Sequence, residues 1–282
     1  MKNFVKAVSL ILTITLLLCT LAACGKNDKK SDGGTTTAPN TVTVTFPEGM
    51  TVIDIAERLE QNGVCSAADF LTVCNQPYDG IEIDNPDDRV FLLEGYVFPD
   101  TYEFYKNSSA KSALDKFIDN YNSKITPEMK QRAADLGFTV DEIITLASII
   151  QKECDKDTAE CANVSSVFHN RLQSPSFPKL QSDVTTFYIK NSLGEYLGYN
   201  SEKDFDEQNE NIKKYMNLYS TYYCNGLPVG PICNPGIKAI NAALNPADTD
   251  YYYFLTDKAG EKFYYSATIA EHRKNGKEAG IF

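Results

Sequence analysis

The sequence is poor in histidine and in basic charge, and both shortages limit what the protein can do. It has only two histidines in 282 residues, and its cysteines show no Cys-x-x-Cys spacing, so a zinc site is not expected. The formal net charge is −11, which argues against nucleic acid as a partner. An acidic surface also disfavours docking onto anionic lipid, so contact with a membrane would need another cause.

The apolar run at the N-terminus is short as well. Lys2 and Lys6 precede an apolar run, residues 8–18, that is too short for a comfortable membrane span. With the small residues that follow, it predicts a lipoprotein signal peptide over residues 1–23. The Leu-Ala-Ala-Cys sequence that ends at Cys24 resembles the bacterial lipobox, which implies cleavage before this cysteine and lipid attachment to its thiol. The alternative is a plain N-terminal membrane anchor, and either one places the remaining chain on the extracytoplasmic face of the cell membrane.

Six cysteines remain once Cys19 has left with the signal peptide and Cys24 carries lipid. They form three couples that are close in sequence: Cys65 and Cys74, Cys154 and Cys161, Cys224 and Cys233. An exported protein can form disulfides, and a free buried cysteine is the alternative because it packs as a small apolar residue. The sequence leaves both states open.

The first part of the exported chain divides into a linker and a small module. Residues 24–41 carry almost no apolar side chain and predict a flexible linker. Residues 42–78 contain an alternating strand and two helices that begin after Thr51 and Ser66. This strand–helix–helix order resembles the LysM-like module that binds cell-wall glycan. The alternative is a small packing module without a ligand.

Further elements follow from simple patterns. Residues 91–105 are rich in aromatic side chains and read as extended, so they supply either a platform for sugar rings or core packing. Residues 110–136 predict one amphipathic helical run that ends at Gly137. Near the C-terminus, residues 251–255 and 262–266 predict a β-hairpin.

The helix after Gly137 carries the strongest candidate residue. Thr139 and Glu142 form a capping box, and the apolar residues that follow predict a buried helix. Helical spacing puts Glu153 on the same face as Leu146 and Ile150. Because burial disfavours the ionised form, the pKa of this carboxyl should rise, as a general acid at neutral pH requires. The alternative is a glutamate at a frayed helix end that faces solvent or pairs with a base such as Arg171.

Six segments in order resemble one known family. Leu-Ala-Ser-Ile-Ile-Gln-Lys-Glu ends at Glu153, and the set comprises residues 93–102, 146–153, 167–172, 180–183, 226–236 and 242–246. Together they are similar to the endolytic murein transglycosylase family, also called YceG-like, over roughly residues 43–280. The resemblance implies an α+β fold, with the LysM-like βαα module of residues 42–78 followed by a mixed α/β catalytic domain, residues 79–282.

The resemblance also implies an activity, with Glu153 as the catalytic residue. The family cleaves peptidoglycan glycan strands between N-acetylmuramic acid and N-acetylglucosamine and leaves 1,6-anhydro ends. One acid performs both proton transfers, so neither a metal nor a cofactor is implied. Peptidoglycan is then the partner, and the family resemblance adds peptidoglycan synthases near which strand elongation would be terminated.

Five further residues are carried over as substrate-binding candidates. Four lie in the matched segments and the fifth, Tyr188, follows the segment of residues 180–183; the five are Glu94, Gln181, Asp183, Tyr188 and Asn234. Glycoside hydrolysis would need a second carboxylate, and two of these five could supply it. A glycan-binding lipoprotein of the same fold without catalysis is the main alternative function, and a solute-binding lipoprotein fits the lipobox but not the ordered motifs.

The chain also departs from the family pattern at several positions. Val184 and Val229 replace prolines that are frequent in the family, Ser220 replaces an asparagine, and the lipobox replaces a transmembrane helix. The three substitutions affect the expected loop shape and subsite preference rather than the reaction.

Overall fold

The computed structural model describes residues 40–154, 158–199, 205 and 209–282. The chain divides into two compact units, Met1–Ala38 and Pro39–Phe282, and every described residue belongs to the second. The predicted signal peptide, the predicted lipid attachment site Cys24 and nearly all of the predicted linker therefore lie outside the described residues. Within the described part of the chain, no helix is long and apolar enough to cross a membrane.

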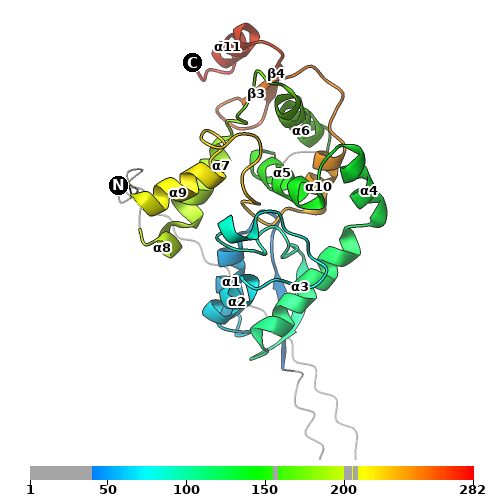
Figure 1. Cartoon of the computed structure of the whole chain (residues 1–282), viewed down its shortest axis with the longest axis vertical. Coiled ribbons are helices and arrows are strands. Elements are labelled where there is room, and N and C mark those ends of the chain that lie inside the picture. The colour runs from blue at the N-terminus through cyan, green and yellow to red at the C-terminus, as the bar shows by residue number, and fades with distance from the viewer. Residues whose placement is uncertain (1–39, 155–157, 200–204, 206–208) are drawn as a thin grey trace, which may run out of the picture. The chain divides into compact units, whose positions relative to one another are not determined.

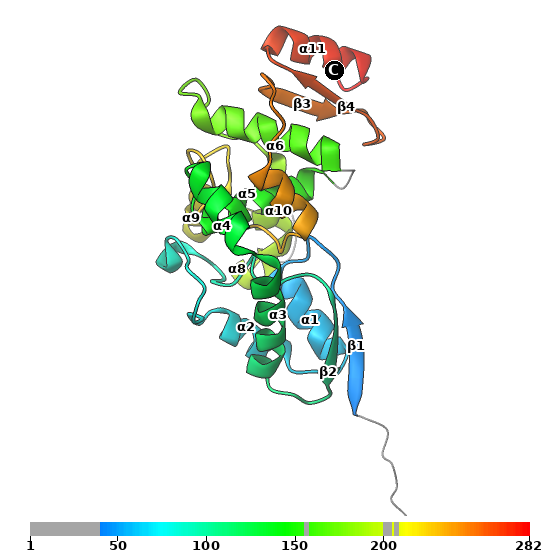
Figure 2. The ribbon, with the colours of Figure 1, turned by 90° about the vertical axis from the view of Figure 1, so that its right-hand side faces the viewer.

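The described residues form a mixed structure of helices and short strands, in agreement with an α+β fold (Figures 1 and 2). The strands are β1 Thr41–Thr45, β2 Thr101–Tyr105, β3 Tyr253–Thr256 and β4 Phe263–Ser266. The longer helices are α1 Val52–Gln61, α2 Ala67–Cys74, α3 Ala110–Lys124, α4 Pro127–Asp135, α5 Val140–Glu153, α6 Thr158–Gln173, α9 Glu210–Tyr219, α10 Ile237–Leu244 and α11 Ile269–Glu278. Shorter helical segments are η1 Pro86–Asp88, α7 Asp183–Phe187, the π-helix η2 Tyr188–Ser192 and α8 Gly194–Leu197.

The N-terminal strand pairs with a strand that lies well beyond residue 78, the predicted end of the small module. β1 pairs with β2 in antiparallel register, so that Val44 lies opposite Tyr102. Helices α1 and α2 pack together, and α3 packs against α2. Phe46, directly after β1, packs edge-on against Phe117 of α3 with ring centroids 5.0 Å apart. The predicted strand–helix–helix unit thus shares its sheet and its core with residues 101–124, and its LysM-like character stays a prediction.

The single helix predicted for residues 110–136 is wrong, because the structure has two. Thr126 caps the second helix by accepting a hydrogen bond from the N–H of Met129, and Pro127 is its first residue. Proline is well suited to a first helical position, where its missing N–H is not needed, and it interrupts a helix elsewhere. The chain therefore breaks between α3 and α4 at residues 125–126.

Helix α5 occupies the centre of the second half of the described chain, where α4, α6 and α10 pack against it (Figure 1). Its predicted capping box is present, and its apolar residues between Ile143 and Ile150 are buried. The prediction of a buried helix ending at Glu153 is confirmed. The predicted C-terminal hairpin is present as β3 and β4, and α11 packs on it.

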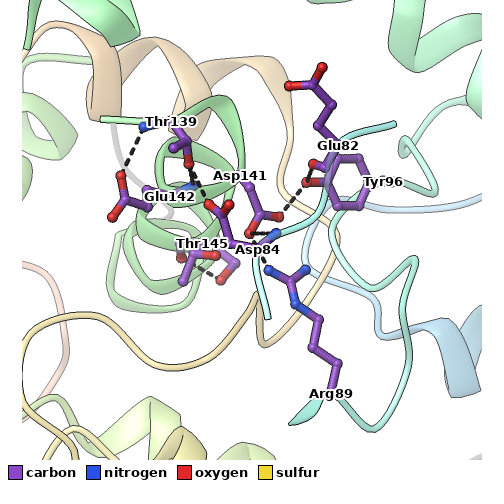
Figure 3. A network of polar contacts seen from close by, with 9 residues as sticks. Glu82, Asp84, Arg89, Tyr96, Thr139, Asp141, Glu142 and Thr145 are labelled. Carbon is purple, nitrogen blue, oxygen red and sulfur yellow. Dashed lines mark hydrogen bonds and ion pairs between the residues drawn. The ribbon is translucent and has the colours of Figure 1, made fainter. Parts of the chain in front are cut away.

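A buried polar network fixes the first turn of α5 (Figure 3). Asp141 is only 4% exposed and accepts hydrogen bonds from the Tyr96 hydroxyl and the Arg89 guanidinium. It also accepts from the backbone N–H of Asp84 at 3.2 Å. A buried carboxylate is tolerated only where it is paired and hydrogen-bonded, as here. The network thereby ties α5 to the segment that precedes β2.

Candidate active site

Glu153 is the last residue of α5 and is half-buried. On its own face of the helix, Leu146 and Ile150 are completely buried, as their spacing predicted. The next residue, Cys154, ends the helix with its N–H donating to the carbonyl of Ile150 at 2.8 Å. Cys154 also forms a disulfide with Cys161, in the first half of α6. The carboxyl therefore sits on a helix end that is fixed by a backbone hydrogen bond and a covalent link.

One hydroxyl holds the Glu153 carboxyl. Ser182 Oγ donates a hydrogen bond to Oε1 of Glu153 at 2.6 Å. Burial raises the pKa of the Glu153 carboxyl above its ordinary value; the Ser182 hydrogen bond and the charge of Arg171 oppose this rise, and the charge of Asp183 adds to it. The direction is the one expected from the sequence. A half-buried carboxyl with a raised pKa keeps its proton to a higher pH than a free glutamate and can still reach a ligand.

Arg171 does not form the ion pair that was the structural alternative for Glu153. Its Nε donates to the carbonyl of Tyr252 at 2.7 Å, and its Nη1 donates to the carbonyl of Leu180. Among the described residues, no ion pair joins it to Glu153. Arg171 instead fixes the start of the loop that carries Ser182.

The segment from Gln181 to Asp183 turns sharply beside Glu153. Gln181 has a φ of 53°, a left-handed conformation that is uncommon outside glycine, and its N–H donates to the carbonyl of Thr221 at 3.1 Å. Gln181 and Asp183 are exposed, while Ser182 between them is only 3% exposed. The turn therefore points the Ser182 hydroxyl inward to Glu153 and leaves its two neighbours open to solvent.

Asp183 lies against an exposed aromatic side chain. The hydroxyl of Tyr222, which is 41% exposed, donates to Oδ1 of Asp183 at 2.7 Å. Burial and the Asp183 hydrogen bond raise the pKa of Tyr222 to about 12, so the phenol stays protonated and remains a donor. Asp183, Tyr222 and Gln181 are polar residues of this loop region that remain exposed.

The other three substrate-binding candidates meet in the protein interior. Asn234 Nδ2 donates to Oε1 of Glu94 at 2.9 Å, and the Tyr188 hydroxyl donates to its Oε2 at 3.3 Å. The exposed fractions of Glu94, Tyr188 and Asn234 are 1%, 3% and 0%. Burial raises the pKa of Glu94 to about 8, although the N–H of Val52, the first residue of α1, donates to both of its oxygens. In this structure these three residues bind one another, and their contact with substrate stays a prediction.

Asn234 uses its whole amide inside the protein. Its Oδ1 accepts from the N–H groups of Gly95 and Val97, each at 2.9 Å, and its Nδ2 donates to the carbonyl of Met50 as well as to Glu94. Gly95 is required at this contact, because it has a φ of 93° and an added Cβ would lie 2.5 Å from Pro231 Cγ. Asn234 thus joins the turn before α1 to the turn before β2.

Among the described residues, no group of three or more metal-binding side chains is close enough to hold a metal ion.

The cysteine couples differ from one another. Cys154 and Cys161 are joined, whereas Cys65, Cys74, Cys224 and Cys233 are free thiols. The Nε2–H of His169 donates a hydrogen bond to the carbonyl of Ala243 at 2.8 Å, which joins α6 to α10.

Comparison with known proteins agrees with the family that the sequence motifs resemble. A sequence profile of the YceG-like family matches residues 29–278. The chain belongs to the YceG-like family. The resemblance seen in the six motifs is thereby confirmed.

Named relatives of this YceG-like chain come from three bacteria. An endolytic murein transglycosylase of Streptococcus pneumoniae is 27% identical over 258 residues, which cover 85% of this chain and 45% of that protein. An endolytic murein transglycosylase of Bacillus subtilis is 34% identical over 186 residues, or 64% of this chain and 46% of that protein. The crystal structure of a YceG-like protein of Listeria monocytogenes aligns with a TM-score of 0.66 at 31% identity, covering 86% of this chain and 78% of that one. The chain spans less than half the length of the two named enzymes.

In this YceG-like protein, three residues that hold the side chains of the site in place were not predicted from the sequence: Ser182, Thr221 and Tyr222. Ser182 stands between two residues that were chosen, and Thr221 and Tyr222 follow a position that was noted only as a departure from the family. A signal for Ser182 was present: a small hydroxyl residue enclosed by Gln181 and Asp183 in a matched segment. Its partner could not be read from the sequence, because 29 residues separate it from Glu153.

Proposed function

We propose that this chain is a lytic transglycosylase that cleaves peptidoglycan glycan strands, with Glu153 as its single acid and base. The observation that carries the proposal is a half-buried carboxyl at the end of a buried helix, with a raised pKa and one hydroxyl partner. Membership of the YceG-like family supports the same substrate, since two relatives are named endolytic murein transglycosylases.

The proposed reaction needs two proton transfers at Glu153. The protonated carboxyl gives its proton to the glycosidic oxygen between N-acetylmuramic acid and N-acetylglucosamine, and the bond from that oxygen to C1 breaks. Positive charge then develops at C1, as in other glycosidic cleavages. The carboxylate takes the proton of the muramic acid C6 hydroxyl, whose oxygen forms a new bond to C1. The product is a 1,6-anhydro end, and Glu153 regains its proton without any water being added.

Hydrolysis would instead need a second carboxylate near the cleaved bond. Glu94 is poorly placed for this role, because it is 1% exposed and its oxygens accept hydrogen bonds from Val52, Tyr188 and Asn234. Asp183 is exposed, and its charge acts on Glu153, so it is the carboxylate that a hydrolytic mechanism would use. The products distinguish the two routes.

The test is digestion of purified peptidoglycan by the chain from Cys24 onward, with products identified by mass spectrometry. We expect anhydro-muramic ends from the wild type and none from Glu153→Gln. Glu261→Gln, which removes an exposed carboxylate in the β3–β4 turn, serves as the matched control and should remain active. Products with reducing ends would show that the enzyme hydrolyses the bond and would contradict the lytic route. Binding to peptidoglycan without any product would support the alternative, a glycan-binding protein of the same fold.

The cellular setting belongs to the same proposal. We place the enzyme on the extracytoplasmic face of the cell membrane, anchored by lipid on Cys24, where cleavage within a nascent strand would end its elongation beside peptidoglycan synthases. The order β1–α1–α2, a strand followed by two helices, supports a LysM-like glycan-binding module. Cys24→Ala should release the protein from the membrane fraction, and unchanged glycan strand lengths in a deletion strain would contradict the role in elongation.

A further inference from the structure

The contact between Ser182 and Glu153 makes the two carboxyl oxygens unequal. Ser182 Oγ lies 2.6 Å from Oε1 of Glu153 and donates its hydrogen to it. For Oε2 of Glu153, the described residues supply no comparable donor. A carboxylic acid carries its proton on one oxygen only, and an oxygen that already faces a donated hydrogen is the unfavourable place for it.

The Ser182 hydroxyl is held in place by both backbone groups of its own residue. The N–H of Ser182 donates to Oγ1 of Thr221 at 2.9 Å. Its carbonyl accepts from Oγ1 of Thr185 at 2.7 Å and from Oγ1 of Thr221 at 3.2 Å. These two threonine hydroxyls are also 3.0 Å from each other, so the three residues form one small buried cluster. Because the backbone of Ser182 is fixed in this way, only its side chain can rotate, and the hydrogen bond to Glu153 sets the orientation of that side chain.

We propose that Ser182 is a positioning residue that holds Oε1 of Glu153 as an acceptor and so leaves the transferable proton on Oε2. The proposal rests on the proposed function, because it specifies which oxygen gives the proton to the glycosidic oxygen and later takes the C6 hydroxyl proton. Ser182 itself neither gains nor loses a proton in either step. Its hydrogen bond strengthens when Glu153 becomes a carboxylate, because a bond to a charged acceptor is stronger than one to a neutral acid.

Removing this hydroxyl should therefore favour the protonated acid. Among the described residues, the other charged or titratable groups that act on Glu153 or contact its neighbours are Asp183 on α7, Arg171 on α6 and Tyr222 in the loop after α9. None of them changes in a Ser182→Ala variant. The pKa of Glu153 should consequently move upward in that variant and stay in place when the hydroxyl is kept by Ser182→Thr.

The first experiment measures this carboxyl without any substrate. Protein labelled with ¹³C at the glutamate carboxyl is titrated by NMR, and the Glu153 signal is identified by its loss in Glu153→Gln. We expect a higher Glu153 pKa in Ser182→Ala, an unchanged one in Ser182→Thr, and an unchanged one in Ser166→Ala. The last is the matched control, because Ser166 is an equally buried serine on α6 that bonds Asn163 and Thr249 instead. An equal Glu153 pKa in all variants would overturn the proposal.

The second experiment measures the reaction as a function of pH. Ser182→Ala should lower kcat/KM by about tenfold, the size expected for one hydrogen bond to a charged group. The alkaline limb of the profile of kcat/KM against pH should move to higher pH in Ser182→Ala. Ser182→Thr should restore both the rate and the position of this limb. An equal loss of kcat/KM at every pH, with the alkaline limb unmoved, would show that Ser182 has only a structural role and would contradict the proposal.

The two experiments separate the two proposals. If the wild type cleaves no peptidoglycan, the proposed function fails, while the titration still decides whether Ser182 holds the carboxyl. If Ser182→Ala folds poorly, Ser182→Cys has nearly the same volume and a much weaker donor, and it should shift the Glu153 pKa in the same direction. A Glu153 pKa that stays in place in Ser182→Cys as well would again exclude the positioning role.

Discussion

The buried carboxyl of Glu94 should make the protein less stable as the pH rises toward neutrality. In the folded chain burial raises the pKa of Glu94 from 4.5 to about 8. The folded state therefore binds this proton more tightly than the unfolded state, so the stability that Glu94 contributes is fully present below about pH 4.5 and is lost as the pH rises to about 8. The hydrogen bonds donated by Val52 and Tyr188 favour the ionised carboxylate and oppose this rise of the pKa, but burial outweighs them.

The size of the effect follows from the width of that pH window. Within it, each pH unit changes the free energy of unfolding by at most about 1.4 kcal/mol. Between pH 5 and pH 7, Glu94 should therefore remove about 2 to 3 kcal/mol of stability, a large part of what a typical domain has. Glu94→Gln keeps an acceptor for Val52 and a donor toward Tyr188 but cannot ionise, so this loss should disappear.

The assay is urea denaturation followed by circular dichroism at both pH values, for the wild type and Glu94→Gln. Glu57→Gln, an exposed carboxylate on α1, controls for the loss of one negative charge. Burial lowers the pKa of His169 and of His272, which makes stability rise with pH, but these groups are the same in every variant. Parallel pH dependence in the wild type and Glu94→Gln would refute the reasoning.

Elements governed by local rules could be predicted from the sequence. The capping box at Thr139 and the apolar periodicity after it located α5 through Glu153 to the residue, and the hairpin of β3 and β4 followed from alternation. The same rules, fully applied, would have divided α3 from α4, because Thr126 before Pro127 is a helix start. That error came from following the apolar pattern alone.

Features that depend on distant parts of the chain could not be predicted. Glu94 was chosen as a substrate-binding residue, yet it is buried and accepts from the N-terminus of α1, which lies 42 residues earlier. Asn234 meets Glu94 across 140 residues, and β1 pairs with β2 across about 60 residues. Such contacts are set by how the helices pack, and no local spacing encodes them. The position of Glu153 was predictable because its own helix determines it, whereas its partner Ser182 was not.

Three further changes test how the site is held. Asn234→Ala should destabilise the fold by about 3 kcal/mol or more in urea denaturation, because it leaves several buried groups without partners; a near-neutral result would contradict the amide contacts described above. Tyr222→Phe should lower kcat/KM about fivefold by freeing Asp183, the value of one ordinary hydrogen bond, and unchanged kinetics would remove this pair from the substrate region. Replacing Cys154 and Cys161 together by serine removes a disulfide between residues seven apart. From loop-closure entropy, this loss should lower the free energy of unfolding by about 2 to 3 kcal/mol. Because this link begins directly after the last residue of α5, the variant should also lose rate at temperatures where it is fully folded. A lower unfolding midpoint with an unaltered rate would show that the disulfide stabilises the chain without positioning the acid.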